Sequence, residues 1–234
     1  MNLSNKKSYL KKHYENDVSR ETKGREMIAT DRDQVVKQLK LSQPVIKNLD
    51  RYVELLESEQ AKMNLVGAST LPVVWTRHIL DSAQLFERLF PSDKVMLDLG
   101  SGAGFPALVL AIMDMEKKRV FHLVESDGKK CAFLQKITDA CGLKNVQIHN
   151  ERIEKMEKFS ADVITARALA PLDKLIKYAY PFFKKSTRCL FMKGAKANDE
   201  LAAALKKYQC RVEKIQSVSS DEGTILELSE VKKK

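Results

Sequence analysis

Apolar residues between positions 35 and 89 recur at intervals of three and four, which is the period of an amphipathic α-helix. The pattern predicts a helix from Val35, a second helix that begins near Pro44, and a third apolar stripe between Pro72 and Leu89. Proline suits the first turn of a helix, because its missing N–H would have no partner inside the helix. The segment 35–91 is therefore predicted to be all-helical.

After Pro91 the pattern changes to short β-rich runs that alternate with helical stretches. Such alternation is typical of a doubly wound α/β domain with a mostly parallel sheet. The last two runs are joined by turn-forming residues at 219–223 and predict an antiparallel hairpin. The predicted strands are Val95–Leu99, Val120–Glu125, Val146–His149, Asp162–Thr165 and Arg188–Met192, with hairpin strands Cys210–Val218 and Thr224–Val231. The predicted helices are Phe105–Met113, Gly128–Cys141, Leu172–Phe183 and Asp199–Tyr208.

Residues 1–34 contain few large apolar side chains and no sustained period, so we expect a flexible basic arm there. The predicted organisation is thus an arm (1–34), a helical N-terminal subdomain (35–91) and an α/β domain (92–234). The longest run without a polar residue, Phe105 to Met113, is shorter than the roughly 18 apolar residues of a membrane span. The first residues are charged where an export signal is apolar, so we expect a cytoplasmic protein.

Lysine and arginine number 41 against 31 aspartate and glutamate residues, a net charge of +10. An excess of this size attracts polyanions and makes nucleic acid the leading partner class. A basic surface kept for solubility explains the charge equally well. The four cysteines show no C-x-x-C spacing and no paired histidines nearby. We therefore expect neither a metal site nor a disulfide framework.

The strongest local signal is the run from Val95 to Pro106, an apolar strand that enters a G-x-G-x-G loop and then a helix. In open α/β sheets, ligands bind at the carboxyl ends of the strands. The dinucleotide-binding fingerprint needs a third glycine where this chain has Phe105, and no phosphate-binding G-x-x-x-x-G-K-[ST] loop occurs. Glu125 ends the next strand, at the distance from Gly100 expected of a carboxylate that binds ribose hydroxyls. The pattern resembles a class I S-adenosylmethionine-dependent methyltransferase more than a dehydrogenase.

Two motifs that this chain lacks reduce the number of possible methyl acceptors. Methylation at carbon 5 of a pyrimidine needs a cysteine nucleophile, and none of the four cysteines follows a proline as it does in that class of enzyme. Methylation of exocyclic amines commonly uses an [N/D/S]-P-P-[Y/F] loop, where this chain has Thr165-Ala166-Arg167. The remaining acceptors include those that already carry a free lone pair, such as guanine N7. Such chemistry needs no general base.

Several spaced motifs occur in the order seen in the bacterial 16S ribosomal RNA guanine-N7 methyltransferases, also called the glucose-inhibited division protein B family. The chain resembles this family from about Val35 to Val231. The motifs are Asn64-Leu65-Val66, Arg77-His78, Asp81-Ser82, Leu97–Pro106, Glu125-Ser126, Lys129-Lys130, Phe133-Leu134, Arg152-Ile153-Glu154, Ala166-Arg167-Ala168 and Lys193-Gly194. The resemblance implies a class I, Rossmann-like methyltransferase fold with an N-terminal helical extension. It also implies S-adenosyl-L-methionine as the methyl donor and S-adenosyl-L-homocysteine as the product. The implied acceptor is N7 of a guanine in 16S rRNA, the family's guanine-527 target.

The glycine loop and the resemblance together give a set of candidate site residues. The cofactor-binding candidates are Gly100, Gly102, Gly104, Phe105, Glu125, Ile153, Glu154 and Arg167. The substrate-positioning candidates are Arg167 and Lys193, and none is required as a general base. The RNA-binding candidates are Arg77, His78, Lys129, Lys130 and Lys193, with Lys184, Lys185 and Arg188 as further members of a phosphate-binding rim.

His78 and Asp81 share one face of the predicted helix, a pairing that also occurs in hydrolases. No G-x-S-x-G nucleophile elbow accompanies them, so we expect a structural or RNA-contacting role. Two alternatives to the favoured function stay open: a methyltransferase acting on another RNA or a small molecule, and a non-enzymatic basic RNA-binding protein. The expected partner is 16S rRNA or a precursor of the small ribosomal subunit. We expect no membrane association and a monomer.

Overall fold

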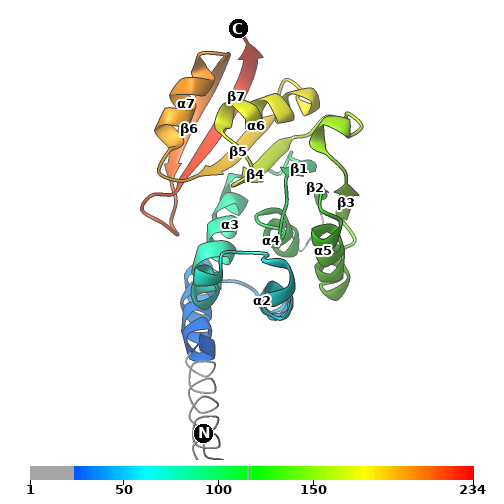
Figure 1. Cartoon of the computed structure of the whole chain (residues 1–234), viewed down its shortest axis with the longest axis vertical. Coiled ribbons are helices and arrows are strands. Elements are labelled where there is room, and N and C mark those ends of the chain that lie inside the picture. Colours follow the sequence, from blue (N-terminus) through cyan, green and yellow to red (C-terminus); the bar gives the residue numbers. More distant parts are fainter. Residues whose placement is uncertain (1–23, 115, 117) are drawn as a thin grey trace, which may run out of the picture.

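A seven-stranded sheet forms the centre of the computed structural model, which describes residues 24–114, 116 and 118–234 (Figure 1). The strand order is β3-β2-β1-β4-β5-β7-β6. Neighbouring strands from β3 to β5 are parallel, and β7 runs antiparallel to both β5 and β6. The strands are β1 (Val95–Leu99), β2 (Val120–Glu125), β3 (Val146–Asn150), β4 (Val163–Arg167), β5 (Arg188–Lys193), β6 (Tyr208–Gln216) and β7 (Thr224–Lys233). The predicted parallel sheet with a C-terminal antiparallel hairpin is confirmed.

Helices cover both faces of the sheet, and each face has its own hydrophobic cluster. One cluster joins the sheet to α2 (Gln43–Met63), α4 (Ala107–Met113) and α5 (Gly128–Ala140). The other joins it to α6 (Leu172–Ala179) and α7 (Ala197–Leu205). Along β1, Met96 belongs to the first cluster, whereas Leu97 and Leu99 belong to the second. Both sides of the central strand are therefore buried, which explains its nearly continuous apolar sequence.

The third predicted helix, from Pro72 to Leu89, is one helical stretch with changing hydrogen-bond spacing. It consists of 3₁₀ turns at Ala68–Val73, a π-helical segment at Trp75–Leu80, the short α3 (Asp81–Ala83) and 3₁₀ turns at Gln84–Arg88. Pro72 lies inside the first of these and cannot donate a backbone hydrogen bond. Within the described part of the chain, no helix is long and apolar enough to cross a membrane.

A helix at 24–39 precedes α2, so residues 24–34 are helical although the sequence places them in the arm. The buried Asp31 fixes this helix to the helical segment Trp75–Leu80. Its carboxylate accepts hydrogen bonds from the backbone N–H groups of Trp75, at 2.8 Å, and Thr76, at 3.1 Å. The remainder of the predicted arm, 1–23, lies outside the described residues, and the division into arm, helical subdomain and α/β domain stays a prediction.

Several predicted boundaries are wrong by a few residues. The helix predicted to reach Phe183 leaves the α-helical form at Ala179 and continues as a 3₁₀ turn at Tyr180–Phe182. Pro181 within that turn has no N–H for a helical hydrogen bond. Tyr208, predicted as a helix end, begins β6. Here the pairing with β7 determines the structure, which a local pattern does not reveal.

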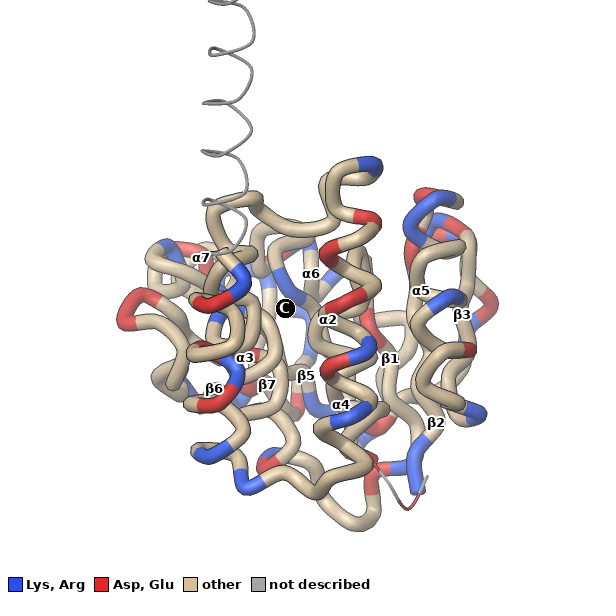
Figure 2. Tube along the Cα trace, turned by 90° about the horizontal axis from the view of Figure 1, so that it is seen from below, with Lys and Arg blue, Asp and Glu red and all other residues tan. Residues whose placement is uncertain are grey.

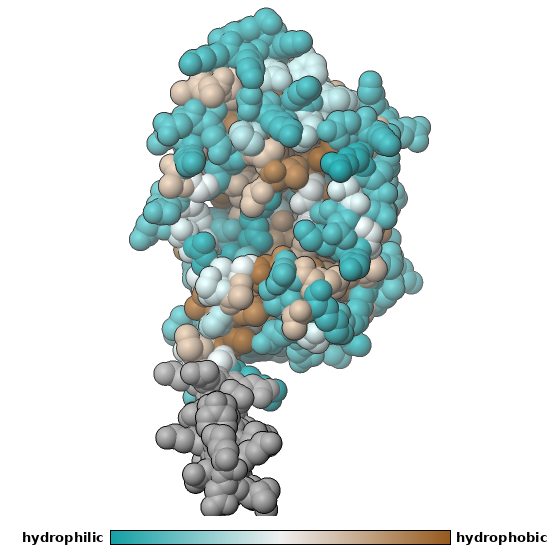
Figure 3. Space-filling view, viewed as in Figure 1, coloured by the Kyte–Doolittle hydropathy of each residue, from teal (hydrophilic) through white to brown (hydrophobic). Residues whose placement is uncertain are grey.

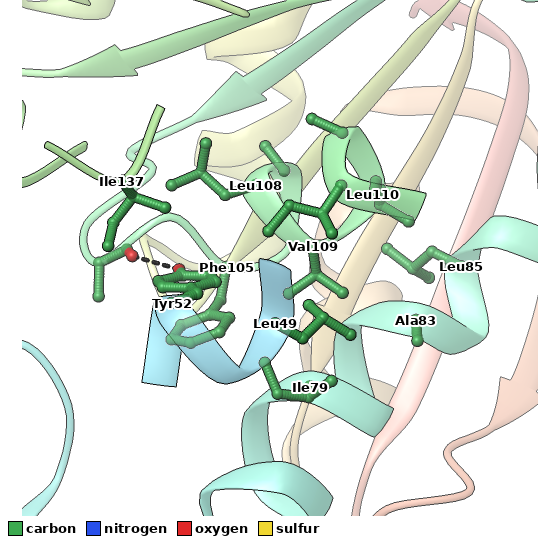
Figure 4. Close-up of a cluster of buried hydrophobic side chains, with 14 of the residues drawn as sticks. Leu49, Tyr52, Ile79, Ala83, Leu85, Phe105, Leu108, Val109, Leu110 and Ile137 are labelled. Carbon is green, nitrogen blue, oxygen red and sulfur yellow. Dashed lines mark hydrogen bonds between the residues drawn. The ribbon is translucent and has the colours of Figure 1, made fainter. Parts of the chain in front are cut away.

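Tyr52 connects α2 to the glycine loop that follows β1. Its side chain is fully buried, and its hydroxyl donates a hydrogen bond of 2.5 Å to the carbonyl oxygen of Ala103 (Figure 4). Its ring stacks on Phe105 with 5.1 Å between ring centroids. Burial disfavours the charged phenolate and raises the pKa of Tyr52 well above its ordinary value, so the hydroxyl keeps its proton. Tyr52 thus fixes the glycine loop to α2.

The Tyr52→Phe variant should be less stable than the wild type by about 1–3 kcal/mol, because the Ala103 carbonyl would lose its buried donor. Urea unfolding measures this difference. The control is Tyr180→Phe, since Tyr180 is 42% exposed and should change the free energy of unfolding by less than about 0.5 kcal/mol. Equal effects of the two substitutions would contradict the role given to the Tyr52 hydroxyl.

Candidate functional site

The carboxyl ends of β1 and β4 lie side by side in the middle of the sheet. The chain leaves β1 for α4 on one face and β4 for α6 on the other, which makes this the switch point where open α/β sheets bind ligands. Two cavities open here. The glycine-loop cavity, about 410 Å³, is lined among others by Gly100, Gly102, Phe105, Glu125, Ile153, Glu154 and Arg167. The hairpin cavity, about 790 Å³, is lined among others by Arg77, His78, Asp81, Arg167, Lys193, Gly194, Ser217 and Ser219. Leu65, Arg167, Ala168 and Leu169 line both cavities.

The glycine loop approaches its neighbours more closely than a side chain would allow. Gly100 has φ +68°, and a Cβ atom on it would lie 2.6 Å from the Cδ1 atom of Leu169. Gly104 has φ +99°, and a Cβ atom there would lie 2.5 Å from the Cδ1 atom of Leu108 and 2.7 Å from the Tyr52 hydroxyl. Gly100 therefore lines the glycine-loop cavity, whereas Gly104 is buried on the side of α2 and α4.

Glu125, at the end of β2, joins the tip of that strand to the loop. Its carboxylate accepts hydrogen bonds of 2.9 Å from the backbone N–H groups of Gly102 and of Asp127. Each carboxylate oxygen keeps a further lone pair that a ribose hydroxyl could use. The sequence prediction of a carboxylate beside the loop is thus consistent with this geometry.

The other predicted residues of this region differ in how they face the cavity. Ile153 and Glu154 follow β3 in a 3₁₀ turn and line the glycine-loop cavity, Ile153 half-buried and Glu154 exposed. Lys130 also lines it. Lys129 is exposed in the first turn of α5 and is not among the residues that line either cavity.

Arg167 stands at the end of β4, in the wall between the two cavities. Its Nη2 atom lies 2.9 Å from Nδ1 of His78, and its Nη1 atom lies 3.4 Å from a carboxylate oxygen of Asp81. Its guanidinium carbon is 4.9 Å from the centre of the Phe105 ring. Burial lowers the pKa of Arg167, although the group stays charged because guanidinium is so strong a base. These contacts fix a partly buried cation at the junction.

The hydrogen bonds around His78 determine its tautomer. The Thr70 hydroxyl donates its only hydrogen to the Gly67 carbonyl at 2.6 Å, so it accepts from Nε2–H of His78 at 2.8 Å. Nδ1 of His78 is then free to accept from Arg167. Burial, with the charges of Arg167 and Arg77, lowers the pKa of His78 to about 3. His78 is thus neutral and holds Arg167, and RNA contact by His78 stays a prediction.

Lys193 is bound to the loop after β4. Its ammonium group donates to the Ala170 carbonyl at 2.8 Å and pairs with a Glu200 oxygen at 2.6 Å. The same Glu200 oxygen accepts from the backbone N–H of Leu172 at 2.8 Å. Lys193, whose side chain is 7% exposed, therefore fixes the segment 168–171 that forms the shared wall.

Arg188 is not part of a phosphate-binding rim, which corrects one prediction. Its guanidinium is buried and pairs with Asp93 at 2.7 Å and with Glu227 at 2.8 Å, over the ring of Phe90. These partners could not be predicted from local patterns, because they lie far from Arg188 along the chain. Arg77, in contrast, is exposed at the hairpin cavity.

Two features of the site were missed by sequence reasoning. Asp81 accepts hydrogen bonds from the hydroxyls of Ser217, at 3.1 Å, and Ser219, at 2.5 Å, and so ties the loop between β6 and β7 to the helical segment. Asp98, in β1, is 2% exposed: one oxygen accepts from the Thr165 hydroxyl at 2.6 Å, and the other is buried and has no hydrogen-bond partner among the described residues. The sequence feature that could have indicated Asp98 is a carboxylate between two leucines, Leu97 and Leu99, of a buried strand.

The surface near the site mixes charges and apolar groups. Figure 2 shows both Lys or Arg and Asp or Glu along α2, so this helix does not carry the net positive charge. Figure 3 shows the apolar surface of one face as small patches among hydrophilic residues. The positive side chains that line the two cavities are Arg77, Lys130, Arg152, Arg167, Lys193 and Lys196.

The Asp98→Asn variant should change the pH dependence of stability. Burial raises the pKa of Asp98 to about 6, above its value of about 3.9 in an unfolded chain. Below pH 4 the Asp98 carboxyl is protonated in both the folded and the unfolded wild type, so it costs no stability. As pH rises through 6, the wild type loses stability, because the buried carboxyl must ionise. The variant lacks this loss, so its stability relative to wild type should rise by about 2–3 kcal/mol between pH 4 and pH 8.

Urea unfolding at several pH values measures this difference. Asp221→Asn, at an exposed position of the β6–β7 loop, is the control and should give a constant difference from wild type. A constant difference for Asp98→Asn as well would refute the assignment of the raised pKa to this carboxyl.

Comparison with known proteins gives a consistent group of relatives. The family model described as GidB, rRNA small subunit methyltransferase G, matches residues 45–228. A protein named ribosomal RNA small subunit methyltransferase G from Paramagnetospirillum magneticum is 44% identical over 191 residues, which cover 82% of this chain and 91% of the relative. A protein of the same name from Rhodospirillum rubrum is 42% identical over 193 residues, which cover 82% of this chain and 93% of the relative.

A solved structure of a SAM-dependent methyltransferase from Aquifex aeolicus is similar in fold. It matches with a TM-score of 0.52 and 16% sequence identity, over 67% of this chain and 93% of that chain. At this identity the likeness shows the fold alone. The predicted Rossmann-like methyltransferase fold is confirmed.

Proposed function

The chain belongs to the GidB family of rRNA small subunit methyltransferase G proteins, and we propose that it methylates N7 of a guanine in 16S rRNA with S-adenosylmethionine as donor. The observation that carries this proposal is the arrangement at the switch point. The glycine loop, Glu125 and Arg167 surround one cavity, and a second cavity shares the Arg167 wall. A group-transfer enzyme needs such adjacent sites for its donor and its acceptor.

The residues of the glycine-loop cavity fit a nucleoside with a charged amino-acid tail. Glu125 offers carboxylate lone pairs for ribose hydroxyls, and the backbone at Gly100 and Gly102 allows close approach. We assign Ile153 and Glu154 to the adenine end, and Arg167 to the end that carries a carboxylate. We give Gly104 a supporting role, because it packs against Tyr52 and Leu108. When bound, S-adenosylmethionine supplies a methyl group attached to a positively charged sulfur.

The chemistry of N7 methylation matches the side chains at the junction. Guanine N7 has a free lone pair and loses no proton when a C–N bond forms, so no residue need act as a base. Among the residues that the structure describes, His78 is the imidazole that contacts Arg167, and its Nδ1 lone pair is already used by that contact. With a pKa lowered to about 3, it is also a poor base at neutral pH. This chain's residues therefore act by positioning, which can supply about 7–11 kcal/mol.

The acceptor must be accessible at its N7 edge. In an A-form RNA helix this edge lies in a deep, narrow groove that side chains do not reach. The target guanine should therefore lie in a loop or a distorted segment of the RNA, where the net charge of +10 favours binding. We also propose that the protein acts as a monomer in the cytoplasm, on 16S rRNA or a precursor of the small subunit.

The Glu125→Ala variant should bind S-adenosylhomocysteine at least tenfold more weakly than wild type, because hydrogen bonds to a charged group contribute about 1.5–3 kcal/mol each. Isothermal titration calorimetry measures the affinity. The control is Glu157→Ala, at an exposed position outside both cavities, which should bind like the wild type. Unchanged affinity in Glu125→Ala would argue against the assigned cofactor cavity.

Chain cleavage specific for N7-methylguanine should locate the product. We expect 16S rRNA from cells that carry the gene to be cleaved at one guanine that resists cleavage in cells without it. Restoring the gene should restore the cleavage, and the Glu125→Ala gene should not. Identical cleavage patterns with and without the gene would overturn the proposed function. Methylation of a protein or a small molecule in the same extracts would then support the alternatives.

A further inference from the structure

The hairpin cavity has dimensions suited to a nucleotide. Its volume of about 790 Å³ exceeds the 410 Å³ of the glycine-loop cavity. Sites for small ligands commonly have about 300–1,000 Å³, so one nucleotide fits this space. Of the residues assigned to the cofactor, only Arg167, in the shared wall, also lines the hairpin cavity.

The shared wall between the two cavities consists of the residues that line both of them, Leu65, Arg167, Ala168 and Leu169. Leu169 packs over Gly100 and is 36% exposed, so its apolar surface is open to a ligand. Ala168 has φ +54°, and Lys193 holds the following carbonyl of Ala170. A flat base lying against Leu169 would thus be next to the loop that faces the cofactor cavity. This placement brings an acceptor atom close to the methyl donor.

The charges of the hairpin cavity favour an anionic ligand. The carboxylates of Asp81 and Glu200 are already paired, Asp81 with Ser217, Ser219 and Arg167, and Glu200 with Lys193. Glu222 is exposed at the loop, where water screens its charge. Arg77 and Lys196 are exposed lining residues that can reach phosphates, and Arg167 lies deeper, in the shared wall. Cations at the mouth and an apolar wall inside suit a nucleotide whose phosphates stay outside.

We propose that the hairpin cavity binds the target guanosine after it has been turned out of the RNA, with its base against Leu169 and its flanking phosphates near Arg77 and Lys196. The inference rests on the proposed function and deepens it, because it names the site of the acceptor. Enzymes that modify a base commonly extrude the nucleotide into a pocket in this way. The loop between β6 and β7, held by Asp81, closes the outer side of the cavity.

Gly194 allows the cavity to be filled without disturbing its walls. It lines the hairpin cavity but not the glycine-loop cavity. A Cβ atom on it would meet nothing within 4 Å, and its φ lies outside the left-handed range. The Cβ atom of a leucine or an alanine at this position would therefore meet no described atom within 4 Å. Comparing a small with a large side chain at this position then tests whether the acceptor occupies this space.

The test compares Gly194→Leu and Gly194→Ala with wild type, using 16S rRNA or small subunits from cells without the gene. We expect Gly194→Leu to lower kcat/KM for RNA at least tenfold, mainly by raising KM, and Gly194→Ala to lower it less. Affinity for S-adenosylhomocysteine should stay within twofold of wild type, which also shows that the variant is folded. If the leucine variant loses that affinity, the alanine variant provides the test. Gly24→Leu is the matched control, since Gly24 lies in the helix at 24–39, outside both cavities, and is also open around its Cβ position.

The outcomes separate this inference from the proposed function. Wild-type kcat/KM in a folded Gly194→Leu variant would overturn the acceptor site, while leaving the methyltransferase assignment intact. Failure of the wild type to methylate any RNA would instead overturn the proposed function. A similar loss in Gly24→Leu and Gly194→Leu would also contradict the inference, because it would not depend on filling the cavity.

Discussion

The contact between the Tyr52 hydroxyl and the Ala103 carbonyl fixes the glycine loop on which the site depends. Next to it, the rings of Tyr52, Phe105 and His78 are stacked, with Phe105 5.1 Å from Tyr52 and 5.0 Å from His78. Arg167 packs on the same Phe105 ring. Aromatic stacking and the buried hydrogen bond therefore couple two helical segments to the tips of β1 and β4. A shift of any one of these groups would displace the walls of the glycine-loop cavity.

The electrostatics of the junction follow from burial. Arg167, whose side chain is 19% exposed, contacts a neutral imidazole at 2.9 Å, a carboxylate at 3.4 Å that two serines also share, and the Arg77 carbonyl at 3.4 Å. Asp98 is 2% exposed, and one of its carboxylate oxygens has no hydrogen-bond partner among the described residues. Burying charged groups costs stability unless they are paired and hydrogen-bonded. The incomplete pairing of Arg167 leaves it able to attract an anion from either cavity.

The sequence predicted the sheet well, because buried strands and amphipathic helices leave periodic patterns in their own residues. It could also identify Gly100 and Glu125, since a loop motif and a strand end are local features. It could not identify the contact of Asp81 with Ser217 and Ser219, which joins residues far apart in the chain. For the same reason it misassigned Arg188, whose charge is neutralised by distant carboxylates. Local patterns reveal elements, whereas ion pairs and cavity walls depend on tertiary packing.

The N-terminal helical segment explains how a common fold could acquire a particular acceptor. The sheet and the glycine loop form walls of the glycine-loop cavity, and the fold of the sheet recurs in relatives of low sequence identity. The helical segment contributes Arg77, His78 and Asp81 to the hairpin cavity, and Asp81 in turn holds the β6–β7 loop on its far side. Removing this segment would leave Arg167 without its imidazole and carboxylate partners. The helical extension therefore supplies part of the lining of the hairpin cavity and, through Asp81, holds another part of it.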